Sequence, residues 1–418
     1  MLSLRRLRLV VLEVALLLPV AAWPAAPATK ALLPFTSDEV SNILRHGPWP
    51  VRSGPDPSNR VSGSAAAAAL GAQLFFDAQL SANGQVACAS CHVPAYGWSD
   101  RRVRAAGIGE TRRNTPSVLN SAFNRWFGWS GASDSLWAAS LRPLLDPLEM
   151  GNVERHVANL VRSDPQLACG YRRVFGRAPD AEDETLFVGI GKALAAFQET
   201  LITERTPFDD FRDALARNDK VAAAQYPMAA QRGLRIFVGK GSCNICHFGP
   251  NFSNGEFDKV GIPVRGADGL FDWGRYDGIK SVLASRFNQQ SRHNDDPVRA
   301  KGTSTRHVAL VAEAYGAFKV PGLRNVALSA PYMHNGSLAT LQDVVRHYSG
   351  IDAVKLHIAA SHPHAEMGEE LPPRPAESVL RTLNLNEGEI ADLVAFLGSL
   401  TERRPPRRAP TAKVPGCP

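Results

Sequence analysis

The sequence lacks a long hydrophobic run after its first residues, and it lacks a stripe of Lys and Arg with interleaved aromatic side chains. The first absence leaves no later segment that could span a membrane, and the second disfavours nucleic acid as a partner. Strand patterns are also sparse, which favours helices. What is present is 44% hydrophobic and 21% charged residues in a chain of 418, typical of a globular protein with room for two domains. The formal net charge of +7 favours acidic partner surfaces.

The N-terminus has the pattern of an export signal. Basic residues precede a short apolar stretch at residues 9–23, and small residues follow it. Glu13 and Pro19 interrupt this stretch, so a membrane anchor, the alternative interpretation, would span a bilayer poorly. We therefore predict that residues 1–28 form a signal peptide, cleaved near residues 26–28, and that the protein is periplasmic.

Cysteine is scarce, and four of the six cysteines fall in two Cys-x-x-Cys-His motifs. This spacing brings both thiols and the imidazole to one face of a helical turn. Two thiols can then add to the vinyl groups of one porphyrin while the His binds its iron. The predicted haem-attachment residues are Cys88, Cys91 and His92 in the first motif and Cys243, Cys246 and His247 in the second. We therefore expect two covalently bound haem c groups, with the two histidines as iron ligands.

The motifs have two alternative interpretations. A zinc site would need two more soft or imidazole ligands near each motif, and a redox dithiol would need a βαβ setting. Neither pattern is visible in the sequence. The remaining cysteines, Cys169 and Cys417, could pair in an oxidising compartment, but the sequence does not show whether they meet. We expect a buried thiol at Cys169 and a mobile chain end at Cys417.

Apolar periodicity and helix-start signals predict several helices. Strong helix formers occupy residues 65–76, an apolar face runs through residues 186–201, and another helix is expected at residues 228–237. Asn386 and Glu389 form a capping-box pair that should open the last helix.

The two halves of the chain repeat one plan, in which a helix and a short turn precede the Cys motif and closing helices follow it. The predicted fold is mainly α, with two cytochrome-c-like haem domains. We expect an N-terminal domain at 29–217, a C-terminal domain at 218–405 and a flexible tail at 406–418. Residues 29–64 should form an extended lead-in. Residues 248–318 should form long functional loops.

Motifs outside the cysteine clusters resemble those of the bacterial di-haem cytochrome c peroxidases and their MauG-like relatives. The resemblance runs from about Ser64 to Thr401. The matching segments are Leu-Phe-Phe-Asp from Leu74, Asn-Thr-Pro-Ser from Asn114, Leu-Glu-Met from Leu148, Val-Pro-Gly-Leu-Arg-Asn from Val320 and Ala-Pro-Tyr-Met-His-Asn-Gly from Ala330. The resemblance implies an oxidoreductase with a peroxide-binding haem on the first motif and an electron-transfer haem on the second.

The resemblance also implies roles for three residues, which are the predicted catalytic residues. Trp129 matches a Trp that lies between the two haems and passes electrons, with a core aromatic as the alternative. Glu149 matches a distal carboxylate that moves protons during cleavage of the peroxide O–O bond, with a surface carboxylate as the alternative. Pro143 matches a Pro that shapes the same pocket.

The resemblance extends to the iron ligands. Many family peroxidases block the first haem with a distal His, but no His lies between Val93 and Asn114, so we expect an open first haem. Tyr348 falls at the position of the sixth ligand of the second haem, where MauG-like proteins also carry Tyr. Rival ligands are Met333, His347, His362, His364 and Met367.

The family also holds a calcium ion between its domains. The matching groups here are the side chain of Asn114 and the backbone carbonyls of Ser329 and Pro331. Oxygen ligands of this kind suit calcium. Asn-Thr-Pro is also an ordinary turn sequence, so a turn without a metal is the alternative.

The chain departs from the family pattern near both motifs. A common Trp-Asp-Gly-Arg is replaced by Trp-Ser-Gly-Ala at residues 129–132, and a pocket Gln falls at Ala139. The surface Trp with which MauG oxidises its protein substrate falls at Gly241. The changes at residues 129–132 and at Ala139 remove polar groups near the first haem. The absence of a Trp at Gly241 leaves a specific role in methylamine dehydrogenase maturation without support from the residues.

The leading functional hypothesis is a periplasmic peroxidase that reduces hydrogen peroxide with electrons relayed through the second haem. The donor would be a small protein, either a cytochrome c or a copper protein. One alternative is a MauG-like oxidase that modifies a partner protein, and another is a non-catalytic di-haem electron carrier. Family peroxidases are often homodimers, but nothing in the sequence determines the oligomeric state.

Overall fold

The computed structural model describes residues 31–51, 54–264, 269–351, 380–404 and 414–417. The predicted signal peptide lies outside these residues. The fold is mainly helical, as predicted, and the two short strands pair with each other.

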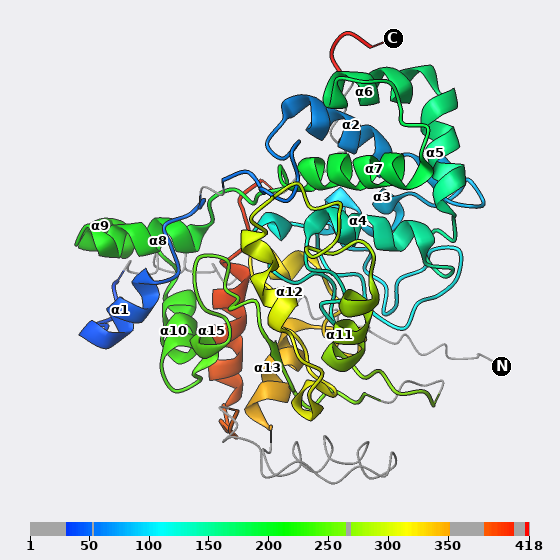
Figure 1. Ribbon diagram of the computed structural model, residues 1–418. Helices are drawn as coiled ribbons and strands as arrows, with labels where there is room; N and C mark the ends of the chain where they lie inside the picture. Colours follow the sequence, from blue (N-terminus) through cyan, green and yellow to red (C-terminus); the bar gives the residue numbers. More distant parts are fainter. Residues whose placement is uncertain (1–30, 52–53, 265–268, 352–379, 405–413, 418) are drawn as a thin grey trace, which may run out of the picture.

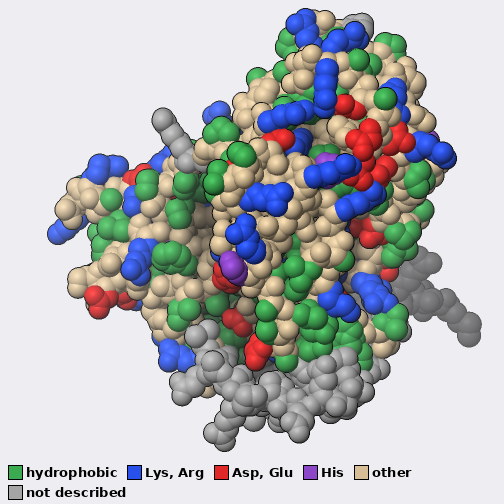
Figure 2. Space-filling view, viewed as in Figure 1, with side chains coloured by type: hydrophobic (Ala, Val, Ile, Leu, Met, Phe, Trp, Pro, Cys, Tyr) green, Lys and Arg blue, Asp and Glu red, His purple; other side chains and the backbone are tan. Residues whose placement is uncertain are grey.

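Among the described residues, no helix has both the length and the apolar character needed to cross a bilayer. Lys and Arg side chains are spread over the face seen in Figure 2 and do not gather in one patch.

Most of the described elements are short helices joined by loops. The α-helices are α1 (Ser37–Leu44), α2 (Ala65–Phe75), α3 (Cys88–Cys91), α4 (Leu136–Leu145), α5 (Glu154–Ser163), α6 (Pro165–Phe175), α7 (Asp183–Gln198), α8 (Pro207–Ala216), α9 (Lys220–Ala223), α10 (Met228–Val238), α11 (Arg275–Ala284), α12 (Thr303–His307), α13 (Leu341–Ser349) and α15 (Glu387–Gly398). The 3-10 helices are η1 (Ala78–Leu80), η2 (Pro94–Tyr96), η3 (Ser121–Phe123), η4 (Cys243–Ile245), η5 (Ala300–Gly302), η6 (Ala312–Ala314) and η7 (Val326–Leu328). Strand β1 (Phe257–Asp258) pairs antiparallel with β2 (Phe318–Lys319).

The first helical group, α2 and α4 to α7, forms the upper right of Figure 1. Its central helix is α7, which is buried on nearly every side and packs against α2, α4 and α5. The close approach of α2 depends on Gly71, because a Cβ there would lie 2.0 Å from the Ala193 carbonyl oxygen. Phe187, Leu194 and Phe197 are almost fully buried in this core, and each such side chain contributes about 1.5–3 kcal/mol on burial.

The second helical group centres on the pair α10 and α15, with α1, α8 and α13 packed beside it. A Cβ on Gly233 would lie 1.9 Å from the Asp392 carbonyl oxygen, so this helix pair also meets through a glycine. Arg232 and Asp392 form an ion pair at 2.6 Å across the same contact. Asn386 and Glu389 make both hydrogen bonds of the predicted capping box.

The helices predicted at 65–76, 186–201 and 228–237 are confirmed as α2, α7 and α10. The expectation of a wholly extended lead-in over 29–64 is wrong, because α1 forms there. Its Thr36–Glu39 capping box gives this short helix a stable start.

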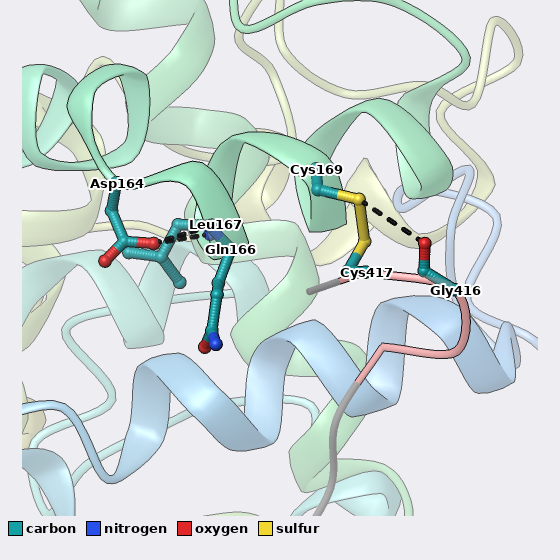
Figure 3. The surroundings of a disulfide bond; sticks show 6 residues. All are labelled: Asp164, Gln166, Leu167, Cys169, Gly416 and Cys417. Atoms are coloured by element: carbon teal, nitrogen blue, oxygen red, sulfur yellow. Dashed lines mark hydrogen bonds between the residues drawn. A yellow bond between two sulfur atoms is a disulfide. The ribbon is translucent and has the colours of Figure 1, made fainter.

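The two leftover cysteines are joined, which corrects two expectations. Cys169 on α6 forms a disulfide with Cys417, with a Cα–Cα distance of 5.7 Å (Figure 3). Cys169 is therefore not a buried free thiol, and the chain end at Cys417 is not mobile. Val414 is 2% exposed and packs in the core of the first helical group, so the last described residues are anchored there.

The long segment after the second motif reaches back to the first helical group. Asp134 accepts hydrogen bonds from the Gln289 backbone N–H at 2.8 Å and from the Thr305 hydroxyl at 2.6 Å. Lys192 of α7 forms a largely buried ion pair with Asp295 at 2.5 Å. These contacts fasten the segment after the second motif to the first helical group.

Candidate functional site

A single cavity of about 770 Å³ lies between the two helical groups and is lined by both Cys-x-x-Cys-His motifs. The predicted site residues Trp129, Pro143, Glu149 and Tyr348 also line it. So do Asn114, Ser329 and Pro331, the groups matched to the calcium site. The fold therefore brings every described residue of the predicted site to one space, although these residues span most of the chain.

The first motif occupies the short helix α3 and the residue that follows it. The His92 Nδ1 donates a hydrogen bond to the Trp98 carbonyl oxygen at 3.2 Å. Because a carbonyl can only accept, Nδ1 carries the hydrogen and Nε2 keeps the lone pair that an iron ligand needs. Burial lowers the pKa of His92, and backbone carbonyls at Trp98 and Pro116 oppose that shift.

The second motif repeats this arrangement. The His247 Nδ1 donates to the Phe252 carbonyl oxygen at 3.0 Å, and burial again lowers the pKa, opposed by carbonyls at Phe252 and Pro321. Near each histidine, a serine hydroxyl donates a hydrogen bond to a backbone carbonyl of the neighbouring loop. The Ser99 hydroxyl donates to the Thr115 carbonyl at 3.0 Å, and the Ser253 hydroxyl donates to the Val320 carbonyl at 2.6 Å.

The cysteines of the motifs fit thioether attachment better than thiol redox chemistry. Burial raises the pKa of Cys88 and of Cys243 to about 12, whereas a reactive dithiol depends on a lowered pKa. Within the described ranges, no three His, Cys, Asp or Glu side chains come together as a metal site. The residues present fit haem, with two thiols and an imidazole lining one cavity at each motif.

Trp129 lines the cavity and is held there by hydrogen bonds at both its ring and its backbone. Its indole Nε1 donates to the Asn114 carbonyl oxygen at 2.8 Å. Its own carbonyl accepts a hydrogen bond from the Lys319 backbone N–H at 2.8 Å. Asn114 lies two residues before Pro116, whose backbone carbonyl approaches His92. Lys319 lies two residues before Pro321, whose backbone carbonyl approaches His247.

Glu149 follows α4 and faces the first motif. The loop at Gly107 packs on its backbone so closely that a Cβ on that glycine would lie 2.2 Å from the Glu149 carbonyl oxygen. Burial raises the pKa of the Glu149 carboxyl, Arg142 lowers it and Asp146 raises it further. A carboxyl group with a raised pKa accepts and releases its proton at a higher pH than a free carboxyl does. Pro143 lies within α4 and lines the same wall.

Tyr348 projects from α13 to the second motif. Burial, the largest cause, raises the pKa of its phenol, and Cys243, Cys246 and Asp258 raise it further. Among its rivals, His347 donates from Nε2 to the Val260 carbonyl at 2.6 Å, and Met333 lines the cavity. The rivals His362, His364 and Met367 lie outside the described residues.

The oxygen groups matched to calcium lie at the junction of the helical groups. The Asn114 side-chain Nδ2 donates to the Arg102 carbonyl at 2.7 Å, which directs the amide and leaves Oδ1 as an acceptor. The Asn114 backbone N–H donates to the His334 carbonyl at 2.8 Å. This hydrogen bond ties the Asn-Thr-Pro turn to the segment that contains Ser329 and Pro331.

Three polar residues of the cavity wall were missed by sequence reasoning. Gln198 lies on α7 and donates to the Ser140 hydroxyl at 2.7 Å, so the pocket has a Gln although Ala139 stands at the family position. The sequence did contain a signal for this residue, because Gln198 is a polar residue in the apolar helix predicted at 186–201. Arg113 forms an ion pair with Asp272 at 2.6 Å, and burial lowers the pKa of Lys319 to about 8.

Gly241, which stands where MauG has its surface Trp, has no room for a larger residue. A Cβ there would lie 2.7 Å from the Ile236 carbonyl oxygen. Replacing Gly241 by any other residue would therefore require the backbone to move.

Comparison with known proteins gives concordant matches. Residues 65–217 match the family described as di-haem cytochrome c peroxidase. The chain is 33% identical over 334 residues to the methylamine utilization protein MauG of Methylorubrum extorquens, covering 79% of this chain and 77% of that protein. It is 31% identical over 349 residues to the cytochrome-c peroxidase IdrP1 of Denitromonas iodatirespirans, covering 81% and 82%. The diheme peroxidase BthA from Burkholderia thailandensis shares the fold, with a TM-score of 0.63, 24% identity and coverage of 88% and 94%.

Proposed function

The chain belongs to the di-haem cytochrome c peroxidase and MauG family of oxidoreductases, and from that premise we propose that it is an exported peroxidase with haem c on both motifs. In this proposal residues 29–217 and 218–405 are its two haem domains, with α1 and α8 of the first range packed against the second helical group. Hydrogen peroxide reacts at the Cys88/Cys91/His92 haem, and electrons enter from an external protein donor through the Cys243/Cys246/His247 haem. The signal-like N-terminus and the disulfide support export to the periplasm.

The observation that carries this proposal is the single cavity shared by both motifs and Trp129. A peroxidase of this kind must move two electrons from the donor side to the peroxide side of one molecule. Trp129 is anchored at the cavity wall by hydrogen bonds at both its ring and its backbone, which keeps its indole in a fixed position. This supports Trp129 as the electron relay.

The residues near the first motif supply proton transfer and orientation. Haem, when bound there, supplies the iron that holds peroxide and the electrons that cleave its O–O bond. Glu149 would take a proton from one oxygen of the peroxide and deliver it to the other, the leaving oxygen. Pro143 and Gln198 shape the wall beside it. The overall reaction consumes hydrogen peroxide, two electrons and two protons and yields two water molecules.

A MauG-like oxidase is the second candidate function, and Tyr348 is the observation that favours it. Tyr348 lines the cavity beside the second motif, where its phenolate would favour higher oxidation states of iron. Such a protein would hold both oxidising equivalents long enough to oxidise a side chain of a partner protein. The first candidate predicts rapid turnover with a reduced donor, and the second predicts a long-lived oxidised state.

The test combines haem content with steady-state turnover. The full-length protein matured with c-type haem should carry two haem groups, and Cys88→Ala/Cys91→Ala or Cys243→Ala/Cys246→Ala should each retain one. The unmodified protein should oxidise reduced cytochrome c or a reduced copper protein when peroxide is added. Either paired variant should lose this turnover. Full turnover by a single-haem variant would contradict the proposed relay.

A further inference from the structure

Four aromatic rings form a continuous file in the loops after the second motif. The rings of Phe271 and Trp273 are stacked with centroids 4.8 Å apart. The Trp273 and Tyr315 rings meet edge to face at 5.5 Å, and the Tyr315 and Tyr276 rings are stacked at 4.0 Å. Each ring therefore contacts the next one, although the residues come from two separate segments of chain.

The inner end of this file opens on the cavity between the motifs. Phe271 lines that cavity, together with its neighbour Asp272. Asp272 is held by Arg113 through two hydrogen bonds of 2.7 Å and 2.6 Å, and Arg113 also donates to the Ser130 hydroxyl at 2.9 Å. The inner ring is thus anchored to the loop that carries Trp129.

The backbone holds the rings in register. The Gly316 N–H donates to the Trp273 carbonyl at 3.1 Å, and the Arg275 N–H donates to the Ala317 carbonyl at 2.7 Å. Gly274, between these contacts, has a φ of +58°, and a Cβ there would lie 2.4 Å from the Ala317 carbonyl oxygen. Only glycine permits so close an approach, so the two segments form one rigid unit.

The outer end of the file is accessible. Tyr315 is 3% exposed, whereas Tyr276 is only partly buried on α11. The Lys280 ammonium lies 5.7 Å from the centre of the Tyr276 ring. A phenol in this position can release its proton to solvent when it loses an electron.

We propose that Phe271, Trp273, Tyr315 and Tyr276 form an aromatic relay that carries oxidising equivalents from the cavity to the surface, and that Tyr276 is a site at which small phenols are oxidised. This inference rests on the proposed peroxide reaction. Trp273 and the two tyrosines are the oxidisable members, and the Phe271 ring bridges the space between Trp273 and the cavity. The aromatic relay is a separate route from the one by which the protein donor delivers electrons through the second motif.

The electron and proton balance of this site is simple. The Tyr276 phenol sends one electron inward along the file and releases one proton to solvent, leaving a tyrosyl radical. An external phenol then gives up one hydrogen atom, which restores Tyr276 and leaves a phenoxyl radical. Two such events supply two electrons and two protons, which are the amounts that one peroxide molecule needs to become two water molecules.

The test uses the full-length, haem-loaded protein with one equivalent of hydrogen peroxide and a nitroso spin trap. After digestion, mass spectrometry locates the trapped radical, while the Soret band of the same sample reports whether peroxide reacted. The expected result is a Soret change with an adduct on Tyr276. Trp273→Leu should remove the Tyr276 adduct, and Tyr276→Phe should remove peroxide-dependent oxidation of guaiacol. Tyr96→Phe is the matched control, because Tyr96 is 37% exposed and lies outside the file.

The outcomes separate the relay from the proposed function. A normal Soret change with the adduct on Tyr96 or elsewhere would overturn the relay and leave the peroxidase proposal intact. The wild-type labelling pattern needs no variant to fold, so this outcome is readable even if Trp273→Leu is unstable. Absence of any Soret change would overturn the peroxide reaction and the relay with it.

Discussion

The indole Nε1 of Trp129 donates a hydrogen bond to the backbone carbonyl of Asn114, 2.8 Å away. The same asparagine directs its side-chain amide to the Arg102 carbonyl at 2.7 Å. The proposed electron relay and the proposed calcium ligand are therefore parts of one hydrogen-bonded unit. A change at either residue should be felt by the other, which leads to the first prediction.

Asn114→Ala should remove calcium from the protein and disturb Trp129. The variant loses the Oδ1 acceptor that the Arg102 contact leaves available, whereas Asn114→Asp keeps an oxygen ligand and adds a charge that calcium favours. Metal analysis after gel filtration should find calcium in the unmodified protein and in Asn114→Asp only. The fluorescence of Trp129, identified by difference from Trp129→Phe, should shift in the alanine variant. Equal calcium content in all three proteins would place the ion elsewhere.

Glu149→Gln should slow the peroxide reaction by about 10²–10⁴-fold, the usual contribution of a general acid–base group. Because burial raises the pKa of Glu149 above its ordinary value of 4.5, the unmodified enzyme should lose the basic form at a higher pH than a free carboxyl would. Its rate should therefore fall as the pH decreases through that raised pKa, and the variant should lack this acidic limb. Stopped-flow rates across pH give both results.

Glu154→Gln is the control for this experiment. Glu154 begins α5, forms an ion pair with Arg286 and lies outside the cavity lining. It should keep the rate and the pH profile of the unmodified protein. Equal rate losses in both variants would argue against a specific role for Glu149.

Tyr348→Met should raise the reduction potential of the haem on the second motif. A phenolate ligand favours ferric iron, and a thioether favours ferrous iron. Because burial beside Cys243 and Cys246 raises the pKa of the phenol, its ionised form depends on the positive charge of the iron. Spectroelectrochemical titration should show one potential rising and the other unchanged. If neither potential moves, Met333 is the next residue to replace, because it lines the same cavity.

Cys169→Ser/Cys417→Ser should lower the free energy of unfolding of the first helical group by about 2–5 kcal/mol. The disulfide closes a loop of 248 residues and holds Val414 in the core, so its loss frees the chain end. Denaturant titration followed by Trp fluorescence measures the change. Adding reductant should destabilise the unmodified protein but not the double variant. The Soret reaction with peroxide should survive in the variant, since neither cysteine lines the cavity.

Local patterns in the sequence predicted four of the helices that line the cavity. Strong helix formers placed α2, apolar spacing placed α7, and the Asn386–Glu389 capping box placed the start of α15. Helix α10 was predicted from its place before the second motif. These signals succeed because each depends on residues within one or two turns of each other. The same reasoning missed α1, whose capping box lies in a segment rich in Pro and Ser.

Contacts between distant segments could not be predicted in the same way. The Cys169–Cys417 disulfide joins residues 248 positions apart, and nothing near either cysteine indicates the pairing. Gln198 enters the cavity from α7, so matching Ala139 to a family Gln did not reveal it. The family resemblance named Trp129 and Glu149, but only the fold provides their hydrogen bonds and burial.

The most direct test of the central claim is optical. The full-length protein, matured with c-type haem and with both irons ferric, is mixed with one equivalent of hydrogen peroxide while the Soret band is recorded. An open first haem beside Glu149 predicts an immediate Soret shift that Glu149→Gln slows greatly. A shift that appears only after one haem has been reduced would reveal a hidden sixth ligand at the first motif and contradict the claim. No shift in either state would favour an electron carrier.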